Sequence, residues 1–354
     1  MDGSGLGRPS AGSLNDVTTG KQGRATGLSI HGIDPEFINA VIAENLGSSV
    51  RRLSTIPRGE INDVYGVTLS NGQQVIARFS RSPEDTFSGE AWAIAQAAAA
   101  GVPVPAVLTV GVSSDEIGLV RYSVQERVAG SPFDSIIRSV GNAKRLTHEL
   151  GEIVAKLHAV RPGGYGYIYG ETGSYPDKGS WISRAVSKIH DMGSLPPGSM
   201  RLAQDDFARL ARILEEGAIT LESNGRLIHG DLAPPNVIIR GGKVRAVIDF
   251  EEAASADPSL DFATWAIDWH AAIPTEWLLA GYAAVVALPS EFDYRLRVML
   301  LYKAFHMLCF YVRLDPYGMR AARISTFIKR LSAHHGSGSV FADLRAAAAE
   351  LDGV

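Results

Sequence analysis

The chain has 354 residues, of which 45% are hydrophobic and 20% are charged, so it holds enough apolar material for a sizeable core and is neither a disordered nor a fibrous protein. With roughly 150 residues per domain as a guide, this length predicts two domains or one domain with two lobes. The formal net charge of −4 and the lack of a long basic run argue against nucleic acid as a partner.

Residues 1–28 are predicted to be a disordered leader. Residues 1–24 are rich in Gly, Ser, Thr and Asn and lack the continuous apolar segment of a signal peptide. No window reaches about 18 uninterrupted apolar residues, which a membrane-spanning helix needs. The single cysteine, Cys309, cannot form an internal disulfide and is expected in the core of a protein from a reducing compartment. We therefore expect a cytoplasmic protein without a membrane partner, as a monomer or a dimer.

Residues 29–128 are predicted to form a small lobe dominated by β-strands. Asn71-Gly72 lies between two β-rich runs, which indicates a hairpin whose two turn residues adopt φ > 0. An alanine-rich segment is predicted to be a helix, since Gly101 and Pro103 follow it as stop signals. The strands are expected at 64–69, 74–79, 107–112 and 118–128, and the helix at 87–100.

Residues 129–354 are predicted to form a larger, mainly helical lobe, because the apolar period changes from 2 to about 3.6 beyond Gly130. One irregular segment, residues 227–250, interrupts the helices with short strands and the turn Gly241-Gly242. The fold class is therefore α+β, with a strand-rich lobe followed by a helical one. Helices are expected around Leu150–Leu157 and Phe207–Leu214 and at 277–287, 294–312, 320–331 and 341–351, and strands at 227–228, 237–239 and 244–248.

The sequence HGDLAPPN at residues 229–236 carries the strongest functional signal. Asp249-Phe250 follows Asn236 after 13 residues, which is the spacing of a kinase catalytic loop and its metal-binding Asp. Phosphoryl transfer needs a carboxylate that orients the acceptor hydroxyl and takes its proton, the role predicted for Asp231. It also needs oxygen ligands for Mg²⁺, which Asn236 and Asp249 supply. The catalytic residues predicted here are therefore Asp231, Asn236 and Asp249.

Two other interpretations of this segment are weaker. One is a β-hairpin that happens to carry polar residues, against which Asn236 at the required position and the later Asp249-Phe250 argue. A hydrolase with a two-metal centre also uses a His-x-Asp pair, but it needs further His and Asp ligands, and the nine histidines of the chain supply no second cluster beside this one. His229 itself is expected to be a structural, hydrogen-bonding residue of the loop.

The motif at 229–236, together with AVIDFEEA at 246–253 and DPSLD at 257–261, resembles the signature of the aminoglycoside phosphotransferase family. The similarity covers about residues 29–268 and extends more loosely to residue 332. It implies a bilobal, protein-kinase-like fold with a small antiparallel-sheet lobe. It also implies transfer of the γ-phosphate of ATP or GTP, with Mg²⁺, to a hydroxyl of a small molecule. In this family, which includes hygromycin and macrolide kinases, the reaction inactivates antibiotics and confers resistance.

The resemblance also assigns nucleotide-binding positions. The loop that would cover the nucleotide, residues 58–65, holds one glycine rather than three. Arg78 stands where kinases have a phosphate-gripping Lys, and it keeps the charge while adding a bidentate fork. Glu90 is its expected ion-pair partner, and the main chain of the connection between the lobes, residues 125–130, is expected to receive the adenine. The nucleotide-binding residues are thus predicted to be Gly59, Asn62, Arg78, Glu90, Glu126 and Val128.

The segment 249–268 is predicted to contribute to the acceptor site. It carries six carboxylates and no Lys or Arg, which suits a cationic acceptor such as an aminoglycoside. By resemblance to hygromycin kinases, the stretch Gly163–Gly166 and Trp181 at the start of a helix also belong to this region. The acceptor residues are predicted to be Glu251, Glu252, Asp261, Asp268, Trp265, Trp269 and His270.

The acceptor itself stays open at this point. A macrolide, a nucleoside antibiotic or a metabolite such as choline or homoserine would use the same chemistry. A catalytically silent kinase-like binding protein is the alternative from a different class, and the intact Asp231, Asn236 and Asp249 argue against it.

Overall fold

The computed structural model describes residues 32–56, 62–83, 87–137, 142–196, 198–333 and 339–351. The predicted leader and Gly59 lie outside these residues. The chain divides into two compact units, one of residues 1–85 with 109–124 and one of residues 86–108 with 125–354. The helix α2 (Phe87–Ala99) belongs to the second unit.

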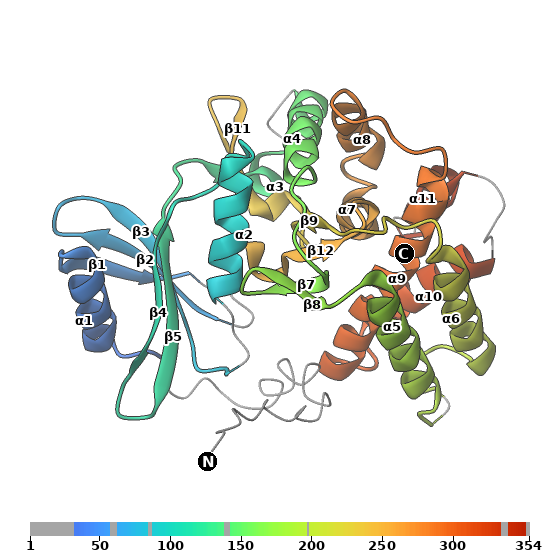
Figure 1. The fold of residues 1–354 in the computed structure, drawn as a ribbon, viewed down its shortest axis with the longest axis horizontal. Helices are drawn as coiled ribbons and strands as arrows, with labels where there is room; N and C mark the ends of the chain where they lie inside the picture. Colours follow the sequence, from blue (N-terminus) through green and yellow to red (C-terminus); the bar gives the residue numbers. More distant parts are fainter. Residues whose placement is uncertain are drawn as a thin grey trace, which may run out of the picture. The chain divides into compact units, whose positions relative to one another are not determined.

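The first unit is built on a five-stranded sheet with the order β1-β2-β3-β5-β4, in which β1–β2 and β2–β3 pair antiparallel (Figure 1). Alternate residues of β3, such as Val75 and Ala77, are fully buried, as expected for a sheet with one face on a core. The predicted strands and the α+β fold class are confirmed. The elements are α1 (Pro35–Leu46), β1 (Val50–Thr55), β2 (Asp63–Leu69), β3 (Gln74–Ser80), β4 (Val107–Ser114) and β5 (Leu119–Glu126), the last two extending by a few residues into the second unit.

Two local features of this unit differ from the sequence-based expectation. The helix α1 was not expected, although Asp34 caps it by accepting from the Glu36 N–H at 3.0 Å and Pro35 occupies its first turn. The hairpin turn is longer than two residues. The Gly72 N–H donates to the Leu69 carbonyl at 2.9 Å, and of the turn pair only Gly72 has positive φ, at 88°. Asn71 instead accepts the Gln73 N–H with its side chain.

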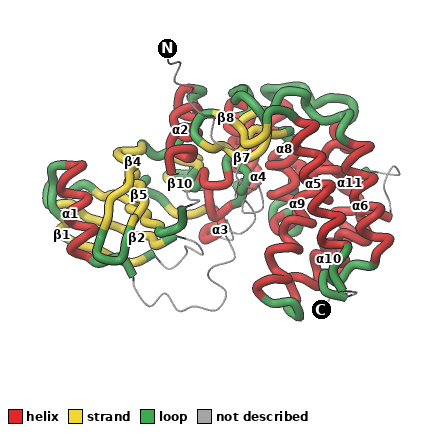
Figure 2. The backbone as a smooth tube through the Cα atoms, turned by 60° about the horizontal axis from the view of Figure 1, so that its bottom comes forward, coloured by secondary structure: helices red, strands yellow, loops and turns green. Residues whose placement is uncertain are grey.

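The second unit contains most of the helices and two small sheets (Figure 2). One sheet has the order β11-β10-β6 and the other β8-β7-β12-β9. The elements after α2 are β6 (Ser131–Pro132), α3 (Phe133–Ile136), α4 (Ala143–Leu157), β7 (Tyr165–Tyr169), β8 (Thr172–Tyr175), α5 (Lys178–Gly193), α6 (Gln204–Gly217), β9 (Arg226–Ile228), η1 (Pro234–Asn236), β10 (Val237–Arg240), β11 (Lys243–Val247), η2 (Phe250–Glu252), β12 (Ala254–Ala256), α7 (Ser259–Trp269), α8 (Thr275–Ala283), α9 (Phe292–Leu314), α10 (Met319–Ala333) and α11 (Val340–Leu351).

The long helix α9 organises the core of this unit, because α6, α7, α10 and α11 all pack against it. Its residues Leu296, Leu300 and Leu308 are fully buried at helical spacing. Cys309 is also buried, as predicted. Within the described ranges, none of the helices combines the length and apolar character needed to cross a bilayer.

Candidate active site

The segment 229–236 forms a loop between β9 and β10 in the second unit. The turn of η1 ends in Asn236, and β10 then pairs antiparallel with β11, with Val237 opposite Val247. The Ile248 N–H donates to the Asn236 carbonyl at 2.9 Å. Asp249 is the next residue, so the hairpin brings Asp249 beside Asn236, as the spacing in the sequence predicted.

Asp231 and Asn236 are joined directly by hydrogen bonds. The Asn236 amide donates to the Asp231 carbonyl at 2.9 Å and to Asp231 Oδ2 at 3.1 Å. This arrangement fixes the rotamer of the carboxylate and leaves Oδ1 without a hydrogen bond to any residue that the structure describes. The geometry therefore offers one carboxylate oxygen to an incoming hydroxyl, as a general base requires.

The start of the loop is held by the buried carboxylate of Asp261 in α7. Asp261 accepts the main-chain N–H groups of His229 at 2.9 Å and Gly230 at 2.8 Å, and it lies 3.0 Å from His158 Nε2. Burial alone would raise the pKa of Asp261, but the hydrogen bond and charge of His158 lower it below its ordinary value. The ionised carboxylate thus connects α4 and α7 to the loop.

His229 and Gly230 fix the path of the chain into Asp231. The His229 ring is buried, and its Nδ1 accepts the Asp231 N–H at 3.3 Å, so Nε2 carries the proton that is donated to the Ile248 carbonyl at 2.8 Å. This agrees with a structural role for His229. Gly230 has φ of 80°, and a Cβ there would lie 1.9 Å from the Glu252 carbonyl oxygen. Only glycine fits this position.

Asp249 adopts a left-handed conformation, with φ 69° and ψ 63°. This conformation is uncommon for a residue with a side chain and is often found at functional sites. Because the Asn236 amide nitrogen donates to Asp231, its carbonyl oxygen faces away from Asp231 and is available as a ligand. One amide oxygen and one carboxylate fit a Mg²⁺ ion, which takes few protein ligands and completes its shell with phosphate oxygens and water. Within the described ranges, no group of three or more His, Cys, Asp or Glu side chains forms a separate metal cluster.

The predicted nucleotide-binding residues lie in both units. Asn62 and Arg78 are buried in the first unit, and Glu90 is buried in α2 of the second unit, where the Gln125 amide lies 3.4 Å from its carboxylate. The pairing of Arg78 with Glu90 stays a prediction. The Glu126 N–H donates to the Ala106 carbonyl at 2.8 Å, and the contact of the Glu126 and Val128 main chains with the adenine stays a prediction.

Three of the predicted acceptor residues lie at the surface, and we call Glu251, Glu252 and Asp268 the acceptor surface. Glu252 is partly buried and is hydrogen-bonded to the hydroxyl of Tyr167 in β7; the charge of Glu252 raises the pKa of that phenol well above its usual range. Tyr167 is 39% exposed, so an aromatic ring stands beside this carboxylate.

The surroundings of Asp268 are less negative than the sequence suggested. Asp268 is exposed to solvent, but the protein around it is dense enough that partial desolvation raises its pKa, as does the charge of the Asp231 carboxylate. Three cations from α9 and α10 lower the pKa of Asp268, namely Arg320, Arg323 and Lys303. Asp268 is therefore accompanied by positive charges that lie 35 or more residues further along the chain.

Three other predicted acceptor residues are buried, which corrects their assignment. Asp261 has no exposed surface, because its oxygens are used to hold the loop. Trp265 is also fully buried, and its indole N–H donates to the Ile273 carbonyl at 3.1 Å. His270 lies in the turn before α8 and accepts the Thr275 N–H at 3.3 Å. Trp269 is half-buried against the core. Packing rather than ligand binding accounts for the first three.

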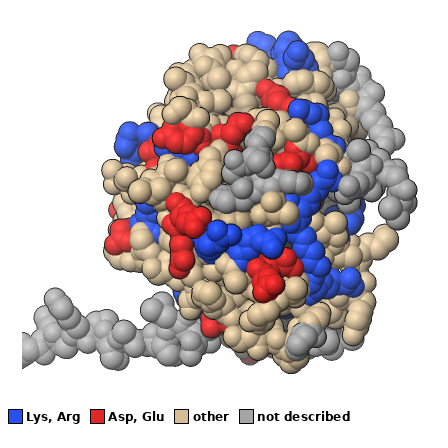
Figure 3. Space-filling view, turned by 90° about the vertical axis from the view of Figure 1, so that its right-hand side faces the viewer, with Lys and Arg blue, Asp and Glu red and all other residues tan. Residues whose placement is uncertain are grey.

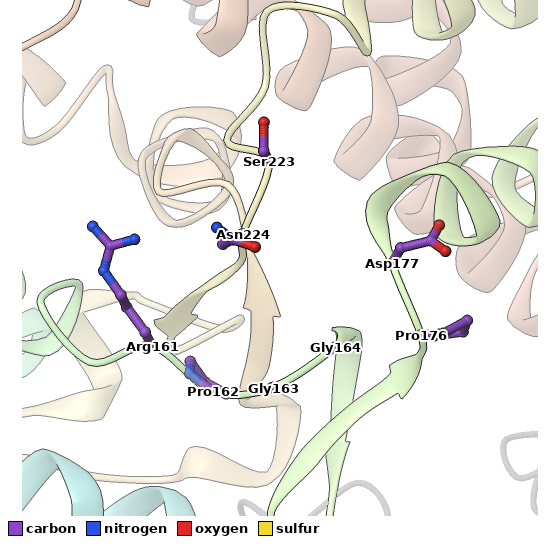
Figure 4. Close-up of a pocket in the computed structure, with 8 residues that line it drawn as sticks. All are labelled: Arg161, Pro162, Gly163, Gly164, Pro176, Asp177, Ser223 and Asn224. Atoms are coloured by element: carbon purple, nitrogen blue, oxygen red, sulfur yellow. The ribbon is translucent and has the colours of Figure 1, made fainter.

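The glycine stretch before the loop lines a different cavity. A hollow of about 230 Å³ is bounded by Gly163 and Gly164 on one side and by Asp177, Ser223 and Asn224 on the others (Figure 4). Asn224 precedes β9, whereas the catalytic loop follows it. The cavity therefore lies at the opposite end of this strand from Asp231. Trp181 is a buried residue of α5, which begins at Lys178 after the cap Asp177.

Two side chains that contact the loop region were missed by the sequence analysis. His158, at the C-terminal end of α4, reaches Asp261, and Lys303 of α9 donates to the Gly230 carbonyl at 2.9 Å. A signal for Lys303 was present, since it is the one charged residue in the apolar run 298–309. A charge inside an apolar helix face must find a polar partner.

Comparison with known proteins supports the kinase interpretation. A model of the phosphotransferase enzyme family matches residues 52–295. Among solved structures, a thermostable mutant of aminoglycoside phosphotransferase APH(4)-Ia in a ternary complex with ADP and hygromycin B has 20% identity and a TM-score of 0.68, covering 85% of this chain and 99% of that one. A search of curated protein sequences gives no significant match.

Two further solved structures share the fold but differ in acceptor. A macrolide 2'-phosphotransferase from Brachybacterium faecium has 18% identity and a TM-score of 0.54, covering 86% of this chain and 99% of that one. An amicoumacin kinase in complex with AMP-PNP and Ca²⁺ has 16% identity and a TM-score of 0.60, covering 85% of this chain and 93% of that one. Likeness at this level of identity concerns the fold.

Proposed function

The chain belongs to the phosphotransferase enzyme family, and we propose that it transfers the γ-phosphate of ATP or GTP to a hydroxyl of an aminoglycoside-type antibiotic, which would inactivate the drug. The observation that carries the kinase chemistry is the hydrogen-bonded set of Asp231 and Asn236 with Asp249 beside it. This set has the residue types and the spacing that phosphoryl transfer requires.

In the proposed mechanism Asp231 receives the acceptor hydroxyl. Its Oδ2 is held by the Asn236 amide, so Oδ1 accepts the hydroxyl hydrogen and directs the oxygen toward the phosphate. The proton passes to the carboxylate as the new P–O bond forms. Because the loop is fixed before the acceptor arrives, little reorganisation accompanies the step.

Asn236 and Asp249 are the proposed metal ligands. Mg²⁺, when bound there, neutralises charge on the nucleotide phosphates. The chain's own contribution is to hold one amide oxygen and one carboxylate on adjacent ends of β10 and β11. In the first unit, Arg78 is proposed to contact the phosphates, with Glu90 as its partner. Asn62 and the carbonyl of Glu126 with the main chain of Val128 are proposed to contact the rest of the nucleotide.

The choice of an aminoglycoside rests on the acceptor surface. Glu251, Glu252 and Asp268 offer carboxylates to amino groups, and Tyr167 next to Glu252 provides a ring that packs against a sugar face. A solved relative of the same fold was crystallised with hygromycin B, an acceptor of this class.

One observation favours a second candidate, an acceptor with at most one positive charge. Arg320, Arg323 and Lys303 lie around Asp268, so the charge next to this carboxylate is of mixed sign. Figure 3 shows that, on the face drawn there, basic and acidic side chains also lie side by side. A polycation gains little from a surface of mixed sign. A macrolide, with a single amine, or a zwitterion such as homoserine would tolerate it.

The decisive experiment measures release of ADP from MgATP, or of GDP from MgGTP, with a panel of hygromycin B, a macrolide, a nucleoside antibiotic, choline and homoserine. We expect at least one acceptor to stimulate release in the wild type and not in Asp231→Asn. If no acceptor raises ADP release above that of the Asp231→Asn variant, the protein is a silent, kinase-like binding protein and the proposed function fails.

A further inference from the structure

Lys303 lies in the middle of α9 and is half-buried in an otherwise apolar stretch of that helix. Its ammonium group donates to the Gly230 carbonyl oxygen at 2.9 Å, although 73 residues separate the two. Ordering a long side chain in a partly buried position costs conformational entropy and desolvation. The position of Lys303 is informative because its ammonium group binds Gly230, the residue immediately before the predicted base Asp231.

The Gly230–Asp231 peptide group is held at both ends. On one side the Gly230 oxygen receives the Lys303 ammonium, and on the other the Asp231 N–H donates to His229 Nδ1 at 3.3 Å. Thr264 also approaches the same oxygen, but at 3.5 Å, and its hydroxyl proton has a better acceptor in the Leu260 carbonyl at 3.0 Å. Lys303 is thus the main donor to this oxygen among the residues that the structure describes.

Lys303 also interacts electrostatically with a nearby carboxylate. Asp268 lies one helical turn after Thr264 on α7. Its pKa is raised by the charge of the Asp231 carboxylate and lowered by the charge of the Lys303 ammonium. The ammonium therefore acts on the Asp268 carboxylate while it donates one proton to Gly230. The orientation of this peptide group fixes where the Asp231 Cα lies, since the peptide plane runs from the Gly230 Cα to the Asp231 Cα. The carboxylate that this Cα carries is then held by the Asn236 amide at 3.1 Å.

We propose that Lys303 is a positioning residue of this kinase: by binding the Gly230 carbonyl it locks the Gly230–Asp231 peptide so that the Asp231 carboxylate faces the acceptor hydroxyl. This inference rests on the proposed function. Lys303 acts through Asp231, and it contributes to turnover rather than to nucleotide binding. The catalytic loop therefore has three outside anchors, with Asp261 on the amide side, Lys303 on the carbonyl side and Ile248 at the ring of His229.

The test compares Lys303→Met, which keeps the length and removes the charge and the donor, with Lys303→Arg, which keeps both. Lys178→Met is the matched control. Lys178 is also half-buried, and its ammonium also donates to main-chain carbonyls, those of Ala218 at 2.7 Å and Leu221 at 2.8 Å. It lies at the start of α5 and has no contact with the catalytic loop among the described residues.

The measurements are kcat, KM for MgATP, the melting temperature, and hydrogen–deuterium exchange of the peptide covering residues 229–237. We expect Lys303→Met to lower kcat about 10- to 100-fold, because small displacements of a catalytic group have effects of this size. KM for MgATP should change less than about twofold, and exchange in 229–237 should rise. Lys303→Arg should recover most of kcat. Lys178→Met should lower the melting temperature without affecting kcat or this exchange.

Three results would overturn the proposal: kcat of Lys303→Met close to that of the wild type, an equal loss of kcat in Lys178→Met, or unchanged exchange in residues 229–237. If no acceptor of the panel used to test the proposed function raises ADP release by the wild type, the proposed function fails instead. Exchange in Lys303→Met then decides separately whether Lys303 holds the loop, because this measurement does not depend on turnover.

Discussion

The catalytic loop at 229–236 and the acceptor surface of Glu251, Glu252 and Asp268 are built in opposite ways. In the loop, His229 and Gly230 are tied by main-chain hydrogen bonds to the buried Asp261. On the acceptor surface, Glu251 and Asp268 are exposed side chains, and the charges around Asp268 are of both signs.

This difference has an energetic reason. A buried carboxylate that receives two N–H groups cannot be replaced without leaving those groups unsatisfied, whereas an exposed charge contributes little to stability and is readily exchanged. The chemistry is thus held by parts of the molecule that tolerate few changes, and the acceptor by parts that tolerate many. The following variants test this contrast, beginning with the largest expected effect.

Replacing the predicted base should stop turnover while leaving the fold intact. Asp231→Asn keeps the volume and can still receive the Asn236 amide, but it loses the proton acceptor. We expect kcat to fall by about 10²–10⁴-fold, the usual contribution of general acid–base catalysis, with MgATP affinity unchanged. Steady-state ADP release and calorimetric binding of MgATP give both numbers. Asp205→Asn, in the first turn of α6, is the surface control; turnover of Asp231→Asn near the wild-type rate would exclude Asp231 as the base.

Removing a proposed metal ligand should affect nucleotide binding instead. Asp249→Ala is expected to abolish Mg²⁺-dependent binding of ATP, and Asn236→Ala to weaken it, since an amide oxygen is the weaker ligand. Titration of ATP with and without Mg²⁺ separates the metal-dependent part. Equal affinity of Asp249→Ala and the wild type for MgATP would remove the metal-binding role of Asp249.

The anchor Asp261 should matter for stability more than any residue of the acceptor surface. Asp261→Asn removes the charge that receives the His229 and Gly230 N–H groups and leaves His158 without its buried partner, so we expect a loss of about 3 kcal/mol in the free energy of unfolding. Denaturant titration measures it.

The pH dependence provides an internal check on that loss. The pKa of Asp261 is lowered in the folded protein, so its stabilising contribution is complete above the unfolded pKa of about 3.9 and disappears as the pH falls through the folded value. The difference between Asp261→Asn and wild type should therefore shrink below about pH 4. A constant difference down to lower pH would contradict an ionised Asp261.

The smallest effects are expected on the acceptor surface. Glu251→Gln with Asp268→Asn should raise KM for hygromycin B by about two- to fivefold and leave KM for MgATP unchanged, since exposed pairs contribute 0.2–1 kcal/mol each. Added salt should weaken acceptor binding, because exposed charges are screened over about 8 Å at physiological ionic strength. Calorimetry with hygromycin B and a macrolide at two salt concentrations compares the candidates. Salt-insensitive binding, or binding of the macrolide alone, would favour the second candidate.

Features that depend on residues close together in the chain could be predicted from the sequence alone. The catalytic loop could be recognised because its Asp and Asn lie in one short segment and the second Asp follows after one hairpin. Gly241-Gly242 was correctly placed as a turn, and both residues have positive φ, at 61° and 68°. The helices with period 3.6 were found because one face of each is apolar. The helix α1 was not predicted, although Asp34-Pro35 places a capping residue and a proline at its start.

The sequence could not predict which polar side chains meet the loop or which aromatic ones are buried, because both depend on how distant elements pack. Asp261 and Lys303 reach the residue pair His229-Gly230 across 31 and 73 positions of the chain, and no local pattern encodes such a contact. Trp265 and Asp268 lie on the same helix, yet one is in the core and the other at the surface. The burial of Trp265 and the exposure of Asp268 depend on the packing of α7 against α9, because side-chain burial is determined by the elements that cover a helix and not by the helix alone.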